Sequence, residues 1–565
     1  MSPRGSDDRA DTAPVRPKGV LRWAGLPATE ARRRRSGPRL HAPAAQPAAQ
    51  PTAQPVVWSR LALDLLSYAA VFAVVLVGAV VRLHALGAIG FNSDEAVYAG
   101  QAAALAGHAD YAKFFAIFRA HPLLVQFLLS ISFQFGVSDV AGRLVSVFFG
   151  LAAIPLMYLL GRLLFTRAVG VIAAATLALL TYHVVVTRQV LLDGPETTLF
   201  LLSMYLLARY AATSMPRYLY VAAVAGGLAF LAKETAILVL PVAGAFMLMT
   251  PSMKLGWRRI AAAIGLYAVT ISPYPISVAI SGASGTAREF LLWQVLRRPN
   301  HSFTFYAEIL PGAIGLVLLL LAIAGVVMAV RKGTWQDRLL LAWIFVPLIF
   351  FQVWPVKGYQ YLLPIMPPVI VLAVRVVKPL TRWFFDVSDP GRWRLRLAPV
   401  AAPAVAALLL LSLGLSTILA VQQPAALGSL AGTGGLPGGR EAGRWIDENL
   451  PEGAAFMTIG PTLSNVIQFY GHRRSQGLSV SPNPLHRNPA YDPIRNPDDS
   501  IRTLRIQYVA FDIWSASRSK FFAAVLMRYV TKYHGRLIYE QQAKTRAADG
   551  SPRSETVIRI YEVRP

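Results

Sequence analysis

The sequence predicts an α-helical polytopic membrane protein with a C-terminal extracytoplasmic α/β domain. Hydrophobic residues make up 55% of the 565 positions, charged residues only 15%, and the mean hydropathy is +0.47. A soluble protein of this size cannot bury so much apolar surface. Long apolar segments recur as far as residue 421, and beyond it the composition becomes that of a soluble domain.

Charge and cysteine content narrow the possible functions. Lysine and arginine outnumber aspartate and glutamate by 55 to 29, which gives a net charge of +26. Nucleic-acid binding would fit such a balance. The basic residues flank apolar segments, however, so we interpret them as the cytoplasmic ends of membrane spans and expect no nucleic-acid partner. The absence of cysteine excludes disulfides, cysteine-ligated zinc, iron–sulfur clusters and thiol nucleophiles.

The composition divides the chain into four parts. Residues 1–57 are rich in proline, alanine and arginine, which predicts a disordered basic cytoplasmic tail rather than a cleavable signal peptide. Residues 58–424 form the predicted membrane part. A glycine-rich linker, 425–440, leads to a soluble domain, 441–565.

Eleven apolar segments are predicted to span the membrane. They are Leu65–Val81, Leu144–Phe165, Ala168–Val186, Thr197–Ala208, Tyr218–Ala232, Ala236–Met249, Ile260–Ile280, Ile309–Val330, Leu339–Trp354, Tyr361–Val374 and Leu397–Val421. Pro122–Phe135 would rise only about 21 Å as a helix, against roughly 30 Å of hydrocarbon, so we interpret it as interfacial or re-entrant. Uncertain segments of this kind put the expected total at about 11 to 13 helices.

An orientation follows from the basic residues. With the N-terminus in the cytoplasm, every loop predicted to be inside carries at least two lysines or arginines, as the positive-inside rule expects. The same assignment puts the C-terminus outside, together with the loops 82–143, 187–196, 233–235, 281–308 and 355–360.

The last part alternates helix and strand signals. Helices are predicted at Glu441–Leu450, Thr462–Tyr470 and Ser517–Tyr533, and strands at Ala454–Ile459, Gln507–Ile513, Arg536–Tyr539 and Thr556–Val563. Such alternation is typical of a small α/β domain. The proline-rich loop Ser481–Asp498 could contact an acceptor, although a structural role is favoured.

Two acidic clusters fall in loops predicted to be outside. Asp94 and Glu95 follow the first span, and Asp193 precedes Gly194-Pro195 in the second external loop. Local sequence favours a structural role, because Asn92 with Glu95 forms a capping box and Pro195 suits the first turn of a helix. Both interpretations are compatible, since a cap can fix Asp94 at a helix start while its carboxylate faces a cavity.

Cations and other polar groups are predicted on the same side. These are Tyr98, His121, Arg143, Lys233, Glu234, Arg297, His301, Lys357, Tyr359 and Tyr361. Alternatively, the lysines could extend to the lipid headgroups. The charged residues of the loop 281–308 could simply form a solvated face. A lipid-phosphate leaving group needs positive charge, and an acceptor hydroxyl needs a base. The carboxylates of Asp94, Glu95 and Asp193 could instead hold a divalent cation such as Mg, Mn or Zn.

These segments resemble the membrane glycosyltransferases of the GT-C class. The likeness is to family 39, the protein O-mannosyltransferase-like group, which is related to the lipid A aminoarabinose transferases. It rests on Asp94-Glu95-Ala96-Val97-Tyr98-Ala99, His121-Pro122, Arg143, Leu192-Asp193-Gly194-Pro195, Leu231-Ala232-Lys233-Glu234 and Lys357-Gly358-Tyr359-Gln360-Tyr361-Leu362-Leu363-Pro364.

The resemblance covers residues 65–380 and implies a GT-C fold and an inverting sugar transfer on the extracytoplasmic face. The donor would be a polyprenyl-phosphate sugar, with mannose as the default, and the acceptor a protein, glycan or lipid. Asp94 would act as base, and Asp193 would be the second acidic position. Lys357 and the neighbouring Tyr359 would contact the donor phosphate, with Arg143 and Lys233 as further candidates.

The resemblance has limits as well. His121 stands where aminoarabinose transferases carry lysine, which argues against a lipid A acceptor. The C-terminal domain is similar to those of actinobacterial members.

Two other function classes remain open from the residues alone. A transporter or lipid flippase would need polar groups near the middle of the bilayer, whereas the charges here cluster at the ends of spans. A scaffold or receptor would not need charged groups at the roots of several external loops. The sequence therefore favours a membrane glycosyltransferase.

Overall fold

The computed structural model describes residues 60–117, 121–251, 253, 256–282, 284–385, 394–422, 436–546 and 551–565. The predicted N-terminal tail and most of the predicted linker lie outside these residues. All described residues belong to one compact unit, Ser59–Pro565.

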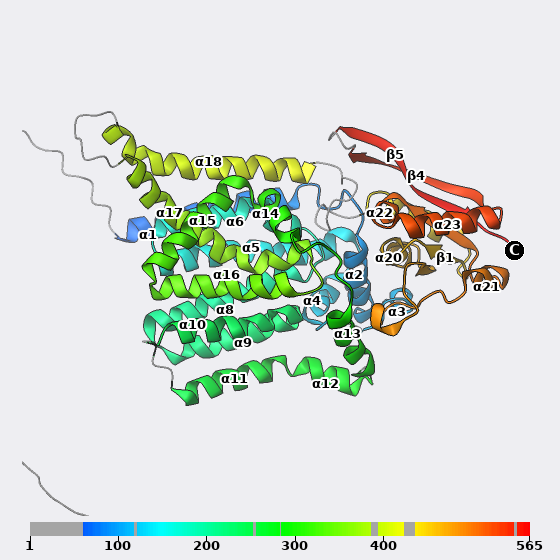
Figure 1. Ribbon diagram of the computed structural model, residues 1–565, viewed down its shortest axis with the longest axis horizontal. Helices are drawn as coiled ribbons and strands as arrows, with labels where there is room; N and C mark the ends of the chain where they lie inside the picture. Colours follow the sequence, from blue (N-terminus) through cyan, green and yellow to red (C-terminus); the bar gives the residue numbers. More distant parts are fainter. Residues whose placement is uncertain are drawn as a thin grey trace, which may run out of the picture. The chain divides into compact units, whose positions relative to one another are not determined.

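The membrane part is built from helices (Figure 1). The α-helices that coincide with the predicted spans are α1 (Arg60–Leu83), α5 (Asp139–Leu164), α6 (Arg167–Leu179), α7 (Thr181–Thr187), α8 (Asp193–Thr213), α9 (Pro216–Ala232), α10 (Val239–Met249), α11 (Trp257–Ile271), α12 (Pro273–Ile280), α14 (Phe305–Ile314), α15 (Leu316–Lys332), α16 (Trp335–Val353), α17 (Met366–Phe385) and α18 (Arg394–Gln422). The segments between them contain α2 (Ser93–Leu105), α3 (Ala109–Ala112), α4 (Leu124–Phe133), α13 (Ser284–Leu296), η1 (Glu234–Leu238) and η2 (Tyr359–Ile365).

Each of the eleven predicted spans coincides with one of these helices or with two in succession. Among the described residues, six helices are long and apolar enough to cross a membrane, and eight if each bent pair is one span. The bends are 57° between α6 and α7 and 112° between α14 and α15. The three further predicted spans correspond to α8, which carries several charges, and to α9 and α10, which are short.

The segment Pro122–Phe135 contains α4, which has 10 residues. A helix of that length rises about 15 Å, which is half of a hydrocarbon core. This agrees with its interpretation as a segment that does not span.

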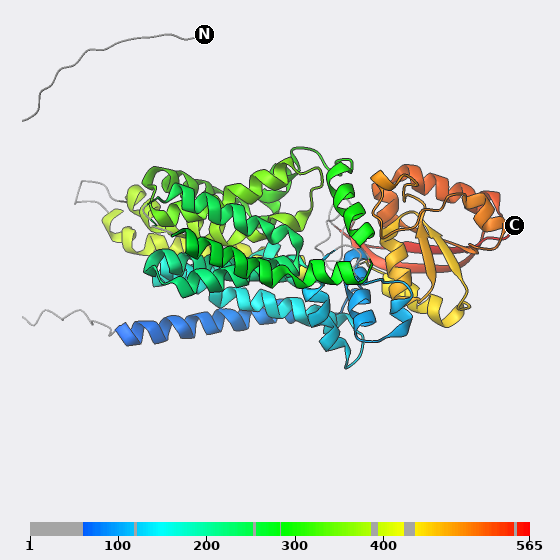
Figure 2. The same ribbon diagram turned by 90° about the horizontal axis from the view of Figure 1, so that it is seen from below.

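The residues after Leu436 form an α/β domain at the end that carries the C-terminus (Figure 2). Its five-stranded sheet has the order β2-β1-β3-β5-β4. The strands are β1 (Ala455–Thr458), β2 (Arg474–Gly477), β3 (Tyr508–Asp512), β4 (Arg536–Arg546) and β5 (Pro552–Glu562). The helical elements are α19 (Gly439–Asn449), α20 (Pro461–Tyr470), η3 (Pro484–His486), α21 (Pro497–Arg502), α22 (Ile513–Arg518) and α23 (Lys520–Lys532). β1 pairs in parallel with β2 and β3, whereas β5 is antiparallel to β3 and β4.

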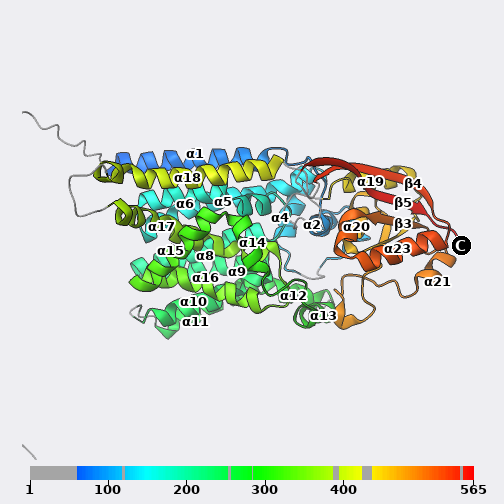
Figure 3. The same cartoon turned by 45° about the horizontal axis from the view of Figure 1, so that its top comes forward.

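Helices cover both faces of this sheet (Figure 3). Successive side chains of a strand point to opposite faces, so Phe456 packs in the cluster that contains α19 and α20, while Met457 packs with α23. Every predicted helix and strand of this domain is confirmed, and β2, with the polar sequence Arg-Ser-Gln-Gly, is an addition.

Polar contacts join the α/β domain to the loop after α1 and to Asp139 at the start of α5. The Tyr470 hydroxyl donates to Asp139 Oδ1 at 2.7 Å and accepts from the backbone N–H of Phe91 at 2.7 Å. Arg440 donates to the other oxygen of Asp139 at 2.9 Å and to the carbonyl oxygen of Gly87 at 2.9 Å. These contacts hold α19 and α20 against the segment that leads into α2.

Candidate active site

Helix α2 begins with the predicted capping box. The side-chain oxygen of Asn92 accepts hydrogen bonds from the backbone N–H groups of Asp94 at 2.9 Å and Glu95 at 3.0 Å. Glu95 Oε2 accepts in return from the backbone N–H of Asn92 at 3.0 Å. The structural interpretation of this motif is therefore confirmed, and it fixes Asp94 in the first turn of α2.

Glu95 and Arg143 form a fully buried pair. Arg143 donates from Nε to Oε1 at 2.8 Å and from Nη2 to Oε2 at 2.9 Å. Its remaining N–H groups donate to the carbonyl oxygens of Leu86, Ile89 and Gly90, so all five donors of the guanidinium are occupied. The structure therefore places both residues, predicted for catalysis and phosphate binding, outside the cavity lining.

The second external loop is attached to the same pair, because the backbone N–H of Val190 donates to Glu95 Oε1 at 3.0 Å. Asn92 Nδ2 also donates to Gln189 at 2.9 Å. These bonds hold the start of α8, and with it Asp193, beside the start of α2.

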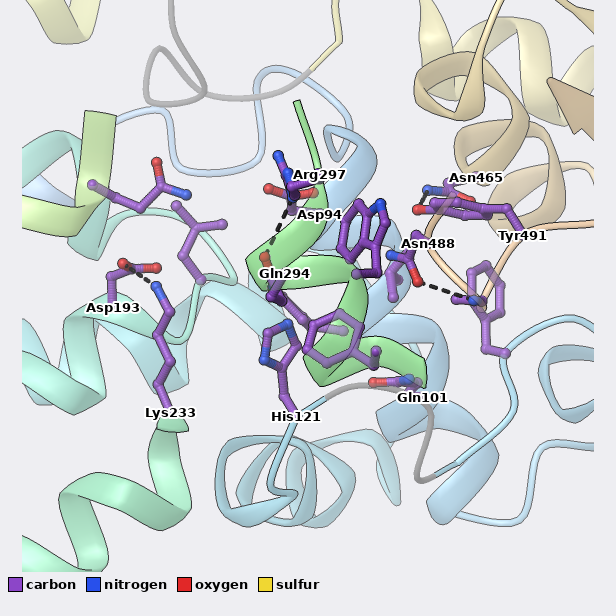
Figure 4. Close-up of a pocket in the computed structure, with 18 of the residues that line it drawn as sticks. Asp94, Gln101, His121, Asp193, Lys233, Gln294, Arg297, Asn465, Asn488 and Tyr491 are labelled. Carbon is purple, nitrogen blue, oxygen red and sulfur yellow. Dashed lines mark hydrogen bonds and ion pairs between the residues drawn. The ribbon is translucent and has the colours of Figure 1, made fainter. Parts of the chain in front are cut away.

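A cavity of about 250 Å³ opens between these helix starts, α13 and the α/β domain. Figure 4 shows Asp193 and Lys233 on one side, Asn465 and Tyr491 on the other, and His121 between them. Of the polar residues predicted from the sequence, the structure brings seven together in the lining. They are Asp94, Tyr98, His121, Asp193, Lys233, Arg297 and Tyr361.

Asp94 is the carboxylate that faces the cavity without a partner. Within the described residues its side-chain oxygens take part in no hydrogen bond or ion pair. The side chain is accessible from the cavity but surrounded by protein. Burial raises the pKa of the Asp94 carboxyl and the charge of Asp193 adds to this, while His121, Lys233 and Arg518 act in the opposite direction.

Asp193 and Lys233 form a second buried pair, with Nζ and Oδ1 2.6 Å apart and both side chains less than a tenth exposed. The ammonium group also lies 4.5 Å from the ring centroid of Tyr361, which lines the cavity too. Lys233 is thus held between a carboxylate and an aromatic face, at the edge of the space that a substrate would occupy.

His121 Nδ1 lies 2.7 Å from Glu234 Oε2. The imidazole makes edge contacts with the rings of Tyr98 at 5.8 Å and Phe290 at 5.5 Å. Glu234 is not itself part of the lining, so its role here is to orient the histidine.

Arg297 provides a cation without a carboxylate partner in the described part of the chain. Its guanidinium lies 4.4 Å from the ring centroid of Trp293 and is 3.4 Å from Gln294 Oε1. Because its charge is not neutralised, it is the group in this cavity best suited to bind an anion.

Three predicted candidates lie elsewhere. Lys357 Nζ donates to the carbonyl oxygen of Trp354 at 3.3 Å. The backbone carbonyl oxygen of Tyr359 accepts from the hydroxyl of Tyr182. His301 stacks on the ring of Phe305 at 4.0 Å. None of the three lines the cavity, so Asp94 and Asp193 converge in one pocket as expected while Lys357 does not.

The α/β domain supplies lining residues that the sequence did not single out individually, although its loop Ser481–Asp498 was considered as an acceptor contact with a structural role favoured. Asn465 and Gln468 come from α20, and Asn488 and Tyr491 come from the loop Ser481–Asp498. Asn465 Nδ2 donates to Ser93 Oγ at 2.9 Å and to the Tyr491 hydroxyl at 3.0 Å. The run of amide and aromatic side chains between prolines was the available signal for this loop.

The carboxylates do not form a joint cation site. No group of three histidine, aspartate or glutamate side chains with metal-binding geometry occurs among the residues that the structure describes. Glu95 is neutralised by Arg143 and Asp193 by Lys233, so these three predicted ligands do not fit one divalent ion.

Comparisons with known proteins agree with this architecture. Residues 120–276 match the family model described as dolichyl-phosphate-mannose-protein mannosyltransferase. No curated protein is significantly similar in sequence.

Solved structures show the likeness over most of the chain. ArnT from Cupriavidus metallidurans in the apo state aligns with a TM-score of 0.64 at 14% identity, covering 88% of this chain and 98% of that one. The same enzyme bound to undecaprenyl phosphate gives 0.62 at 13% identity, with 89% and 98% covered. The archaeal oligosaccharyltransferase AglB from Archaeoglobus fulgidus, in complex with an inhibitory peptide and a dolichol-phosphate, gives 0.53 at 13% identity, with 87% and 74% covered. Helix arrangement, α/β domain and family match together show that this multi-pass membrane protein has the fold of the GT-C glycosyltransferases.

Proposed function

We propose that this protein transfers a sugar from a polyprenyl-phosphate donor to an acceptor hydroxyl in the cavity between α2, α8, α13 and the α/β domain. The observation that carries the proposal is the unpartnered carboxylate of Asp94, which shares this cavity with the cations Lys233 and Arg297. The solved relatives bound to undecaprenyl phosphate and dolichol-phosphate support a lipid-phosphate donor. Mannose is the proposed sugar, because the matching family model is named for it.

The donor phosphate is assigned to Arg297 and Lys233. When the bond between the anomeric carbon and the phosphate oxygen breaks, negative charge increases on that oxygen, and cations already held in place stabilise it. Phosphate leaves as a stable anion, so this step needs no general acid. Lys357, Tyr359 and Arg143 have no part in this assignment, because none of the three lines the cavity.

Asp94 is assigned as the base. It accepts the proton of the acceptor hydroxyl as that oxygen attacks the anomeric carbon from the face opposite the phosphate, which inverts the configuration. Its raised pKa makes it a stronger proton acceptor than an aspartate with the ordinary pKa. Asp193 contributes by positioning Lys233 and by raising the proton affinity of Asp94.

The cavity is proposed to open on the extracytoplasmic side. At the other end of α1, Asp64 pairs with Arg162 at 2.9 Å and with Arg167 at 2.6 Å. Arg162 lies in the last turn of α5 and Arg167 is the first residue of α6, and positive charge at such helix ends suits the cytoplasm. Because the chain after α1 leads into the cavity, we propose that the cavity and the C-terminal domain lie on the opposite, outer side.

The test uses the full-length protein in detergent, a polyprenyl-phosphate mannose donor carrying radioactive sugar, and envelope extract from a strain that lacks the protein. The wild type is expected to form labelled product. Asp94→Asn should lower kcat by about 10²- to 10⁴-fold, with little effect on the KM for the donor.

Asp110→Asn is the matched control, because Asp110 is exposed in the same external segment and pairs with Lys113. It should retain wild-type activity. Full activity of Asp94→Asn would refute the base assignment. Failure of the wild type to transfer any of a panel of polyprenyl-phosphate sugars would refute the proposed function and favour the transporter or flippase, which cannot act vectorially in detergent.

A further inference from the structure

A second cleft of about 210 Å³ adjoins the catalytic cavity on the side of the α/β domain. The two spaces share lining residues, among them Phe114, Asn465 and Tyr491. A molecule that fills the cleft could therefore extend past these three side chains toward Asp94 without leaving the protein surface.

The topology of the sheet makes this cleft a natural binding place. It runs along all four residues of the edge strand β2 to Gly477 at its carboxyl end, next to the start of α20, and β2 is parallel to its neighbour β1. Ligands of open α/β sheets commonly bind beyond the carboxyl ends of parallel strands. At this end of β2, Gly477 lets the backbone of Gly460 pass close by, because a Cβ on residue 477 would lie 2.7 Å from the backbone carbonyl carbon of Gly460.

One lining residue has an unfulfilled hydrogen-bonding group. Ser475 is 3% exposed, and its hydroxyl has no hydrogen-bond partner among the described residues. A buried hydroxyl without a partner costs free energy unless a ligand or water satisfies it. The carbonyl oxygen of Ser475 is already occupied, since Gln468 Nε2 donates to it at 2.9 Å.

The chemistry of the lining favours a neutral, hydroxyl-rich molecule. Its uncharged polar side chains are the amides of Asn465, Gln468 and Gln476 and the hydroxyls of Ser464 and Ser475, and Phe114 and Tyr491 add aromatic rings. Amides and hydroxyls donate and accept at once, as sugar hydroxyls do. Of the charged groups, Lys113 already pairs with Asp110 at 3.0 Å, and Arg474 and Asp492 offset one another in charge.

We infer that this cleft is the acceptor subsite and that the acceptor is a glycan chain, bound through several sugar units while its terminal hydroxyl reaches Asp94. The inference rests on the proposed function and specifies its acceptor class. Ser475, Gln476 and Asn465 bind the preceding units, and the Tyr491 ring lies at the junction of cleft and cavity.

The test measures binding without the donor, so its outcome is independent of catalysis. Saturation-transfer NMR is recorded on full-length protein in nanodiscs with mannotetraose, arabinotetraose and galactotetraose. Gln476→Trp fills the cleft from an edge strand, where tryptophan is well tolerated. Ala524→Trp, exposed on α23 of the same domain, is the control.

At least one tetrasaccharide should bind both the wild type and the control. The same tetrasaccharide should bind Gln476→Trp at least tenfold more weakly. Ser475→Ala should weaken that binding about fivefold, which corresponds to one lost hydrogen bond of about 1 kcal/mol. The same variant should be at least as stable as the wild type, because it removes an unsatisfied buried hydroxyl.

Several results would overturn the inference. Equal binding to wild type and Gln476→Trp would place the glycan elsewhere. If none of the three tetrasaccharides binds, the glycan assignment is refuted. It is also refuted if only a serine- and threonine-rich peptide binds and the Gln476→Trp substitution weakens that binding. Glycan binding in the cleft without sugar transfer by the wild type would instead refute the proposed function alone.

Discussion

The buried pair of Asp193 and Lys233 allows stability to be separated from catalysis. The two side chains are 4% and 7% exposed and their charged atoms are 2.6 Å apart. Lys233→Met leaves a buried carboxylate without its counter-charge, which should lower the free energy of unfolding by about 3–5 kcal/mol. Asp193→Asn should cost a similar amount. The double variant buries no charge at this pair and should lie within about 2 kcal/mol of the wild type.

Activity should behave differently from stability. If Lys233 stabilises the departing phosphate, the double variant regains the fold but lacks a cation that the transition state needs. Its kcat/KM for the donor should then stay about 10- to 100-fold below wild type, the value of one charge-assisted hydrogen bond. Unfolding is followed by urea titration in mixed micelles, and activity by transfer of labelled sugar.

Asp337 and Arg375 provide the matched control, since they also form a buried ion pair in the membrane part but do not line the cavity. Their double variant, Asp337→Asn with Arg375→Met, should regain both stability and activity. Wild-type kcat/KM in the Asp193→Asn, Lys233→Met double variant would show that Lys233 is only a counter-charge. Single variants as stable as the wild type would refute the energetic reasoning.

Three further predictions concern the same cavity. Arg297→Met removes the cation that has no carboxylate partner, so it should lower kcat/KM for the donor by about 10- to 100-fold while urea unfolding stays within about 1 kcal/mol of wild type; an unchanged rate would exclude it as a phosphate ligand. Glu95→Gln leaves the buried Arg143 without a counter-charge, so it should destabilise by about 3–5 kcal/mol in the same titration, whereas normal stability with lost turnover would instead make Glu95 catalytic. Because burial and Asp193 raise the pKa of Asp94, the acid limb of the pH–rate profile should lie above the ordinary aspartate value of about 3.9. The folded state binds this proton more tightly than the unfolded state, so the free energy of unfolding should fall as the pH rises from the ordinary pKa to the raised one. An acid limb at the ordinary value would contradict this prediction.

Most of the fold could be predicted because it depends on local patterns. Long apolar runs predicted the helices of the membrane part, and alternation of strand and helix signals predicted the α/β domain. β2 escaped prediction because Arg474–Gly477 carries no apolar pattern, and its pairing with β1 decides its structure. Crossing the membrane is harder to judge. Helix α8 begins with Asp193, whose charge is neutralised by Lys233, the residue that follows α9.

The site could be predicted only where a motif was local. Asp94, Asp193 and Lys233 follow apolar segments on one predicted side, and the structure brings them together. The bonds of Arg143 to Glu95 link residues 48 positions apart in sequence, so no local pattern showed that this arginine was already occupied. The same applies to the contribution of Tyr491, since its place beside the cavity depends on how the α/β domain contacts α2.

The adjacent residues Asp94 and Glu95 show why the structural and functional interpretations of one motif can both hold. Consecutive positions on a helix point about 100° apart, so one carboxylate can face the protein while the next faces the cavity. Glu95 binds Asn92, Arg143 and Val190 and thereby fixes the first turn of α2. That rigidity keeps Asp94 at the edge of the cavity without a partner of its own, and an unpartnered base held in place needs little reorganisation when it accepts a proton.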